Sequence, residues 1–346
     1  MITLRNPLDS LNFGQWFKLI CGASYQDVSA IRNLTLVYSL AGADCIDVAA
    51  DLSVVRAASE GIDTSQTISS DAIARPWLMV SLSDGHDPHF RKAWFDGQLC
   101  PNSCTRPCEK ACPADAILPS AQPMVLNERC YGCGRCLPVC PQGLIEEHRF
   151  TVTPRTILPS LIPYIDALEI HTQIGRQQEF YNLWQQLSPY INHFKLVSVS
   201  CPDHEPSNDS IVDYLTQLNK LMIPKPQQLL WQTDGRSMSG DVGKGTTHAT
   251  IRLAQKVLNA RLPGYVQLAG GTNNYTVDKL RSLALLKTSQ RLMPGNRSEQ
   301  PYINGIAYGS YARKLIAPKE VYLETQPEQL WKQVTVAREL VSQLKP

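Results

Sequence analysis

Eight of the eleven cysteines lie between residues 100 and 140, in two groups of four. The second group, "CYGCGRCLPVCP", separates Cys130, Cys133, Cys136 and Cys140 by two, two and three residues. Bacterial ferredoxins bind iron–sulfur clusters with this spacing, in which three close thiolates hold one cluster and the fourth ligates another. The two intervening glycines let backbone amides approach the cluster. A zinc site, which favours two separated CxxC pairs, is the alternative.

The first group, "CPNSCTRPCEKACP", separates its cysteines by three residues each, and only its tail "CEKACPADAI" matches the ferredoxin pattern well. Because the fourth cysteine of each group ligates the other cluster, we expect two clusters. One is held by Cys112, Cys130, Cys133 and Cys136, and the other by Cys100, Cys104, Cys108 and Cys140. The unusual spacing leaves open whether the second is [4Fe–4S] or [3Fe–4S], and one cluster plus spare thiols is the alternative. Two clusters would relay or sense single electrons. The alternative is that the clusters have only a structural role and stabilise the fold.

Outside the cysteines, short apolar runs alternate with helical segments. The predicted strands are 16–21, 45–50, 77–83, 167–171, 195–200, 228–233, 265–270 and 303–309. Continuous apolar strands indicate a parallel sheet buried on both faces. Eight such units predict a (β/α)8 barrel of the TIM type, with a doubly wound open sheet as the alternative. A last helix, within 327–344, is expected to pack outside the barrel.

The cysteines follow the third strand, so the prediction is a bacterial-ferredoxin-like insertion at the C-terminal end of the barrel. The expected divisions are residues 1–85 for the first part of the barrel, 86–150 for the insertion, and 151–346 for the rest with the final helix.

The ends of the barrel strands give the remaining candidate residues. They are Cys21, Gly22, Asp51, Asp84, His86, His171, Thr172, Cys201, Asp234, Gly270 to Thr272, and Tyr308 to Ser310. Several have ordinary explanations: Cys21 and Cys201 can fill space, and Asp51 can cap a helix. His171 is the candidate base or ligand.

Two loops, "AGGTNNYT" and "YGSYARK", follow the last two strands, where barrels bind phosphate. Gly270, Gly271, Thr272, Gly309 and Ser310 would supply backbone amides and hydroxyls, as in flavin mononucleotide (FMN) barrels of the dihydroorotate dehydrogenase type. The alternative is that the glycines only form tight turns. "GDVGKGTT" lacks the P-loop spacing.

Composition excludes some partners. The chain has 346 residues, is 43% hydrophobic and carries a formal charge of +2, so its overall charge does not favour nucleic acid. No apolar run reaches the roughly 20 residues of a membrane span, and the first residues resemble no signal peptide. We expect a cytoplasmic protein.

The cysteine groups, together with "WQTDGRSMSGDVGKGTTHATI" and "VQLAGGTNNYT", resemble the cyanobacterial light-dependent period (LdpA) family over essentially the full length. The resemblance implies an iron–sulfur protein that reports cellular redox state, and hence light, to the circadian clock. Its implied partners are the clock's input kinase and the Kai oscillator proteins. It names no catalytic residue.

Three functions follow. The favoured one is a redox sensor that is not an enzyme. The second is an FMN-dependent oxidoreductase fed by the clusters, although no lysine stands at a strand end to neutralise a reduced flavin, since Lys195 opens its strand. The third is a barrel pocket for a quinone or nucleotide, with the loops around His171, Trp231 and Tyr308 lining an aromatic cavity.

Overall fold

Eight parallel strands form a closed barrel in the computed structural model of the chain. The structure describes residues 6–70, 73–85, 90–112, 114–118, 123–127, 129–130, 132–149, 153–202, 210–235, 247–287, 301–316 and 322–345. Around the ring the order is β1-β12-β11-β10-β9-β8-β3-β2. The strands are β1 (Trp16–Ile20), β2 (Cys45–Ala49), β3 (Trp77–Ser83), β8 (Ala167–His171), β9 (Leu196–Pro202), β10 (Leu229–Asp234), β11 (Tyr265–Ala269) and β12 (Gly305–Tyr308).

The predicted barrel is confirmed, with every strand within two residues of its expected bounds. The open-sheet alternative is wrong, because β1 pairs with β12 in parallel from Trp16–Gly305 to Leu19–Tyr308. This closure requires a glycine at 305. A Cβ there would lie 2.5 Å from Trp16 Cδ1 and 2.6 Å from Trp16 O.

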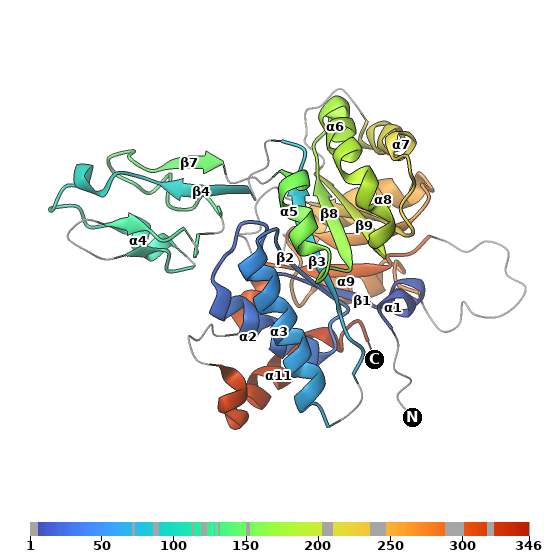
Figure 1. Cartoon of the computed structure of the whole chain (residues 1–346), viewed down its shortest axis with the longest axis horizontal. Coiled ribbons are helices and arrows are strands. Elements are labelled where there is room, and N and C mark those ends of the chain that lie inside the picture. The colour runs from blue at the N-terminus through green and yellow to red at the C-terminus, as the bar shows by residue number, and fades with distance from the viewer. Residues whose placement is uncertain are drawn as a thin grey trace, which may run out of the picture.

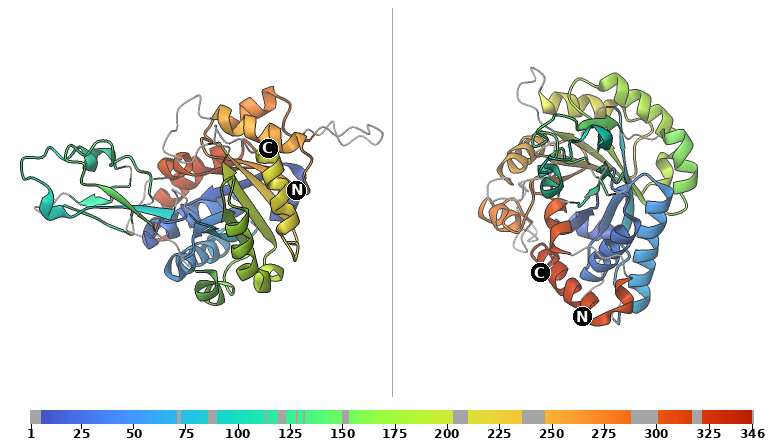
Figure 2. Two further views of the ribbon diagram at one scale, coloured as in Figure 1. Left: turned by 90° about the horizontal axis from the view of Figure 1, so that it is seen from above. Right: turned by 90° about the vertical axis from the view of Figure 1, so that its left-hand side faces the viewer.

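Helices surround the barrel (Figures 1 and 2). They are α2 (Val28–Ala41), α3 (Leu52–Ile68), α5 (Pro154–Leu161), α6 (Gln177–Leu187), η3 (Ser188–His193), α7 (Ile211–Leu221), α8 (Thr247–Asn259), α9 (Thr276–Ser282), α10 (Ser310–Leu315), η5 (Leu323–Thr325) and α11 (Pro327–Val341). The last helix packs outside, against α2, as expected. The helical segment expected from residue 276 ends at Ser282, and Ala284 then takes a left-handed φ of 54°.

A helix that the sequence analysis did not predict, α1 (Pro7–Phe13), closes the N-terminal end of the barrel. Asn6 caps its first turn, and Gly14 ends it with a left-handed φ of 71°. Asn304 Nδ2 donates a hydrogen bond to Leu11 O at 3.2 Å. An apolar layer lies inside this end of the barrel: Leu11, Trp16, Cys45, Trp77, Met79, Ala167, Leu196 and Leu230.

Above this layer the barrel interior is polar and charged. Lys18 Nζ lies 3.1 Å from Asp47 Oδ2 and 3.1 Å from Gln232 Oε1, and it also contacts the Glu169 carboxylate. Gln232 Nε2 donates to Glu169 Oε1 at 2.8 Å. All four side chains are buried, and we call them the central ion group. Although burial opposes it, the two carboxylates raise the pKa of Lys18, so this lysine stays charged.

The cysteine segment emerges between β3 and β8 and projects away from the barrel (Figures 1 and 2). Its elements are β4 (Arg91–Trp94), η2 (Gly97–Leu99), α4 (Pro107–Ala111), β5 (Ile117–Leu118), β6 (Met124–Val125) and β7 (Glu146–Arg149). Antiparallel pairing joins β4 to β7 and β5 to β6. We call residues 90–149 the insertion. The division at residues 85 and 150 stays a prediction, because 86–89 and 150–152 lie outside the described residues.

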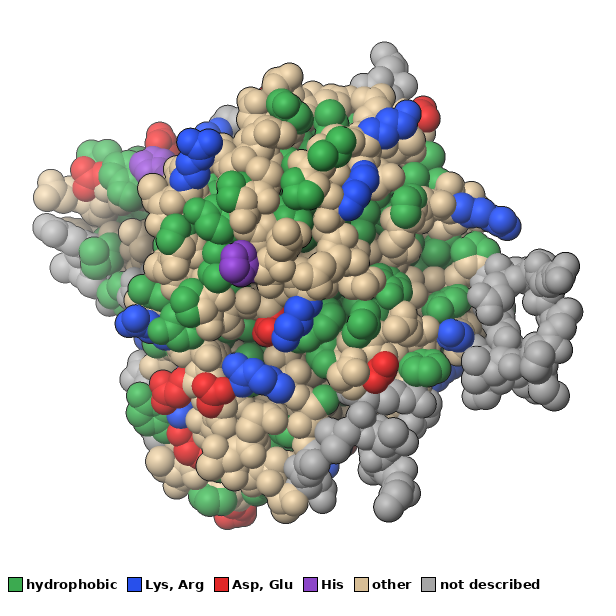
Figure 3. All heavy atoms as spheres, turned by 45° about the vertical axis from the view of Figure 1, so that its right-hand side comes forward, with side chains coloured by type: hydrophobic (Ala, Val, Ile, Leu, Met, Phe, Trp, Pro, Cys, Tyr) green, Lys and Arg blue, Asp and Glu red, His purple; other side chains and the backbone are tan. Residues whose placement is uncertain are grey.

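On the face in Figure 3, lysines and arginines stand singly among neutral and acidic side chains, in keeping with the net charge of +2. Among the described residues, no helix is both long enough and apolar enough to cross a membrane.

Replacing Lys18 with methionine should destabilise the barrel strongly, because Asp47 and Glu169 would stay buried without their cation. We expect a loss of about 3–5 kcal/mol in urea unfolding at neutral pH, and a smaller loss in acid, where protons neutralise the carboxylates. Lys195→Met is the control. Lys195 pairs with Asp166 at 2.7 Å on the surface, so its loss should cost less than about 1 kcal/mol. If Lys18→Met and Lys195→Met lost equal free energy of unfolding, a dominant role for the central ion group would be contradicted.

Candidate metal centre

Cysteine side chains make up much of the small core of the insertion. Its buried members are Ala93, Phe95, Cys108, Ala116, Ile117, Cys130, Cys136 and Ile145, with Cys100, Cys112 and Cys140 packed against them. The two small sheets have only two or four residues per strand. A lobe of this size buries little apolar surface, so cross-links through sulfur would be needed to hold it firmly.

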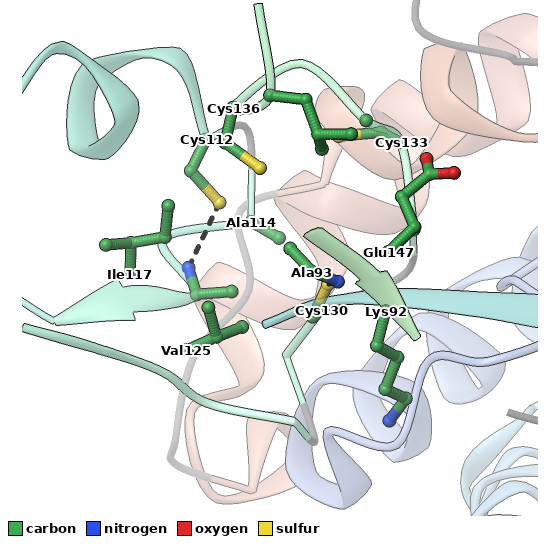
Figure 4. Close-up of a pocket in the computed structure, with 14 residues that line it drawn as sticks. Lys92, Ala93, Cys112, Ala114, Ile117, Val125, Cys130, Cys133, Cys136 and Glu147 are labelled. Carbon is green, nitrogen blue, oxygen red and sulfur yellow. Dashed lines mark hydrogen bonds between the residues drawn. The ribbon is translucent and has the colours of Figure 1, made fainter. Parts of the chain in front are cut away.

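Cys112 of the first group lies with three cysteines of the second. It lines one pocket together with Cys130, Cys133 and Cys136, as Figure 4 shows. The remaining lining is largely apolar and includes Ile117, Val125 and Leu137.

Two backbone N–H groups donate to sulfur in this pocket. Ala116 N–H donates to Cys112 Sγ, and Ala93 N–H donates to Cys130 Sγ, both at 3.3 Å. Gly132 and Gly134 take left-handed φ values of 70° and 71°, which L side chains rarely adopt. The turns between the cysteines therefore depend on these glycines.

Cys140 of the second group is the neighbour of the first three cysteines. Burial raises the pKa of Cys100, and the nearby Cys104 and Cys140 add to the shift. Burial likewise raises the pKa of Cys108, with Cys140 contributing. For Cys140 itself burial acts in the same direction, but the backbone N–H groups of residues 142–145 outweigh it and lower the pKa of this thiol. Such a ring of amides favours a thiolate.

The residues fit an iron–sulfur cluster better than a single ion. Among the described residues, no three His, Cys, Asp or Glu side chains are arranged to hold one metal ion. The four cysteines nevertheless line one pocket, and thiolates are the usual ligands of a cluster. Burial, with the neighbouring cysteines, raises the pKa of Cys136 to about 12. Its free thiol is thus neutral at pH 7, and metal binding there must displace a proton.

The insertion is attached to the loops that follow β1 and β3. Lys92 Nζ donates to Gln26 Oε1 at 2.6 Å and to the Asn127 carbonyl. Arg129 Nε lies 3.8 Å from Asp27 Oδ2. Lys92 therefore links β4 both to the barrel and to another part of the insertion, and its side chain points away from the cysteines in Figure 4.

The candidates at the barrel's strand ends have partners within the protein. Asp51 accepts from the N–H groups of Ser53 and Val54, which confirms the helix-cap explanation. Thr272 Oγ1 donates to Ala307 O at 2.6 Å, and Ser310 Oγ accepts from Arg313 Nη2 at 3.1 Å.

The loop after β11 contacts strand β12 through the bond between Thr272 and Ala307. Gly270 and Gly271 take left-handed φ values of 66° and 97°, as a tight turn requires. Gly309 precedes α10. Phosphate binding by these loops stays a prediction.

Other predicted residues lie apart. Cys21 and Cys201 are buried. Asp84 Oδ1 pairs with Arg176 Nε at 3.3 Å, and the Asp84 carboxylate accepts from Thr172 Oγ1. His86, His89 and most of the "GDVGKGTT" segment lie outside the described residues.

The predicted aromatic cavity is wrong. His171 faces the barrel interior, where its Nε2 lies 3.1 Å from Glu169 Oε1. Tyr308 stacks on Phe17, with ring centroids 5.0 Å apart, in the core between strands and helices. Trp231 belongs to the same outer core. Neighbouring strand residues point to opposite faces, and Gln232, next to Trp231, occupies the interior.

The sequence analysis missed the central ion group. The signal was present: Lys18, Asp47, Glu169 and Gln232 each interrupt an apolar strand. Charged residues in a strand buried on both faces must find one another inside the barrel. Lys18 lies within its strand and not at the strand end, which is where a lysine that neutralises a reduced flavin was expected.

Comparison with known proteins identifies the family of the chain. Over 98% of its length the chain is 48% identical to Light dependent period A of Synechococcus elongatus, covering 94% of that protein. The chain belongs to the light dependent period A family. Residues 100–151 match the family's Fe-S cluster-binding domain and residues 162–343 its C-terminal domain. All eight cysteines of the insertion lie in the first match.

A second relative matches a short stretch of the chain. An uncharacterized ferredoxin of Methanocaldococcus jannaschii is 47% identical over 48 residues, which is 14% of this chain and 32% of that protein. Solved structures with similar folds include a tryptophan synthase from M. tuberculosis (TM-score 0.46, 11% identity, 98% of this chain and 100% of that chain). Another is a truncated 3-deoxy-D-arabino-heptulosonate 7-phosphate synthase from Thermotoga maritima (TM-score 0.43, 9% identity, 94% and 88%).

Cys112→Ala tests the grouping of the cysteines. Although Cys112 belongs to the first sequence group, its loss should disturb the cluster on Cys130, Cys133 and Cys136 and spare the other. We expect roughly half of the bound iron to be lost, measured by iron analysis and electron paramagnetic resonance. Cys45→Ala, inside the barrel, is the control and should keep all the iron. Loss of the other cluster's signal instead would disprove the grouping.

Removing the metal should loosen the insertion and leave the barrel folded. Iron chelation under reducing conditions removes the cross-links of the insertion, whereas the barrel keeps its own core. Trypsin should then cut at Arg129 and Arg135 while the barrel fragments stay resistant. Equal protection of the insertion before and after chelation would contradict this expectation.

Proposed function

We propose that the chain is an iron–sulfur redox sensor that takes part in light-dependent control of the circadian period. The observation that carries the proposal is the meeting of Cys112 with Cys130, Cys133 and Cys136 in an apolar pocket. This is the arrangement that the ferredoxin ligand rule requires. The family's Fe-S cluster-binding domain, matched by residues 100–151, supports the same cofactor.

In this proposal Cys112, Cys130, Cys133 and Cys136 hold a [4Fe–4S] cluster, and Cys100, Cys104, Cys108 and Cys140 hold a second, either [4Fe–4S] or [3Fe–4S]. The donors to sulfur from Ala93 and Ala116 stabilise added negative charge and so tune the potential. The eight thiolates and their amides would bind the clusters, and the clusters would supply one-electron chemistry.

The sensor would act through the attachment of the insertion to the barrel. A one-electron change alters the charge of the insertion, which rests on the barrel through Lys92 and Arg129. A partner that binds one state better would shift the equilibrium between them. The family resemblance makes the clock's input kinase and the Kai oscillator proteins the proposed partners, and the cytoplasm the proposed location.

No observation favours the FMN-dependent oxidoreductase. The hydroxyls expected to bind its phosphate have partners in Ala307 and Arg313. Lys18 is held by Asp47 and Glu169 within the barrel. A quinone or nucleotide in the barrel likewise finds no support in the positions of Trp231 and Tyr308.

The first test is an absorption spectrum of anaerobically purified protein, before and after chemical reduction, with iron and flavin measured on the same sample. We expect a broad band that bleaches on reduction, seven or eight irons per chain, and no flavin peaks. Stoichiometric flavin would overturn the proposal in favour of the oxidoreductase. A band that no reductant bleaches would reduce the cluster to a structural role.

The second test is genetic. In Synechococcus elongatus lacking its own family member, the wild-type chain should restore the normal dependence of the circadian period on light intensity. The Cys112→Ala chain should not, although immunoblotting should show it at a comparable level. Full restoration by Cys112→Ala would contradict the sensing role of this cluster.

A further inference from the structure

His171 stands between the central ion group and the insertion. Its Nε2 lies 3.1 Å from Glu169 Oε1 inside the barrel. Its ring meets Phe90 edge-on, with centroids 5.3 Å apart and an interplanar angle of 81°. Phe90 immediately precedes β4, and His171 is only 6% exposed. The barrel and the insertion therefore meet at this imidazole.

The central ion group is one positive charge short. Lys18 carries one positive charge, whereas Asp47 and Glu169 carry two negative charges when both are ionised, and all three are buried. Leaving a buried charge unbalanced is costly. One proton, on His171 or on Asp47, would neutralise the group.

The surroundings of Glu169 keep its carboxylate ionised, so that it can balance the charge of a proton on His171. Burial opposes its ionisation, but the charge of Lys18 and the contact with His171 prevail and lower the pKa of Glu169. Burial raises the pKa of Asp47, Glu169 adds to the shift, and Lys18 opposes it. Glu169 is thus an anion directly beside His171, and its charge favours the imidazolium form.

A short path of two contacts and one strand leads from His171 to a proposed cluster ligand. Phe90 is followed by β4, whose Ala93 N–H donates to Cys130 Sγ at 3.3 Å. Three strand residues at about 3.3 Å each separate Phe90 from Ala93 by on the order of 10 Å. With the ring contact and the hydrogen bond at its two ends, this places the imidazole about 10–20 Å from the sulfur. Charges at that distance still interact inside a protein.

We propose that His171 is a proton-binding residue coupled to the cluster on Cys112, Cys130, Cys133 and Cys136, so that reduction of this cluster draws a proton onto His171. The inference rests on the proposed redox function and adds a second signal, pH, to it. A low-potential one-electron donor supplies the electron and solvent supplies the proton, which offsets part of the negative charge that the electron adds. His171 does not bind the cluster and acts on it only through its own charge.

Other charged groups lie on the elements around His171. They are the Asp84–Arg176 pair beside the strand end, Lys92 on β4, which bonds to Gln26 and Asn127, and Asp234 at the end of β10. The register neighbours on β3 and β9 are Ser83 and Ser200, which carry no charge.

The size and sign of the effect follow from the distance. An added negative charge about 10–20 Å away, at an effective dielectric constant of about 20, raises the proton affinity of His171 about four- to sixteenfold. By linkage the cluster is easier to reduce when His171 is protonated. The reduction potential should therefore fall as pH rises through the titration of His171. A tenfold coupling corresponds to a total fall of about 59 mV for one electron.

The test is the potential of the reversible bleaching band, measured on anaerobic holoprotein from about pH 5.5 to 8.5, the range in which histidine titrates. Wild type should show the fall, and His171→Gln should show a flat profile at the same iron content. His148→Gln is the matched control. His148 lies within the insertion, stacks on Trp94 at 4.9 Å and is half-exposed, so this variant should keep the fall.

A second measurement, on the wild-type protein, tests the proposal even if the His171→Gln variant fails to fold. Wild-type protein in weakly buffered solution should take up protons on reduction near neutral pH, followed with a pH indicator. A pH-independent wild-type potential, no proton uptake, or an unchanged fall in His171→Gln would each overturn the coupling while leaving the redox function intact. A cluster that cannot be reduced reversibly would overturn the redox function itself, and the coupling with it.

Discussion

The contacts of one buried ammonium group hold the middle of the barrel together. Lys18 of β1 reaches Asp47 of β2, Glu169 of β8 and Gln232 of β10, and so joins strands from opposite sides of the ring. A layer of branched apolar side chains would fill such an interior at no greater cost. Stability alone therefore explains these buried charges poorly. Their role is to fix the positions and the charge states of neighbouring groups.

The insertion depends on the barrel in a different way. Its own core is small and contains many cysteines, and Lys92 on its first strand bonds to Gln26 of the barrel. A stable scaffold beneath a weakly stabilised lobe lets the chemistry of the lobe change its shape without endangering the fold. The path from Glu169 through His171 and Phe90 to Ala93 crosses this boundary.

The barrel strands could be predicted because parallel strands buried on both faces form continuous apolar runs. The ferredoxin spacing of the second cysteine group likewise indicates its chemistry locally. The helix α1 was missed although Asn6, Pro7 and Gly14 form an ordinary start and stop, because the segment was examined only as a targeting signal. The polar residues that interrupt the apolar strands indicate buried charges. Which of them meet depends on the order of the strands in the closed ring, and no local pattern gives that order. The cavity expected between Trp231 and His171 failed for a related reason. Strand residues one apart face opposite sides, and the polar Gln232 rather than its aromatic neighbour faces inward.

The two ends of the insertion lie side by side where it joins the barrel. Arg91 and Arg149 are paired across β4 and β7, so the insertion leaves and returns at a single point. To the barrel it is a loop with adjoining ends, and the entropy of closing such a loop grows only slowly with its length. A module joined in this way is portable: its length or its cofactor can change through evolution, or be exchanged by an engineer, without any change in the register of the eight strands that carry it.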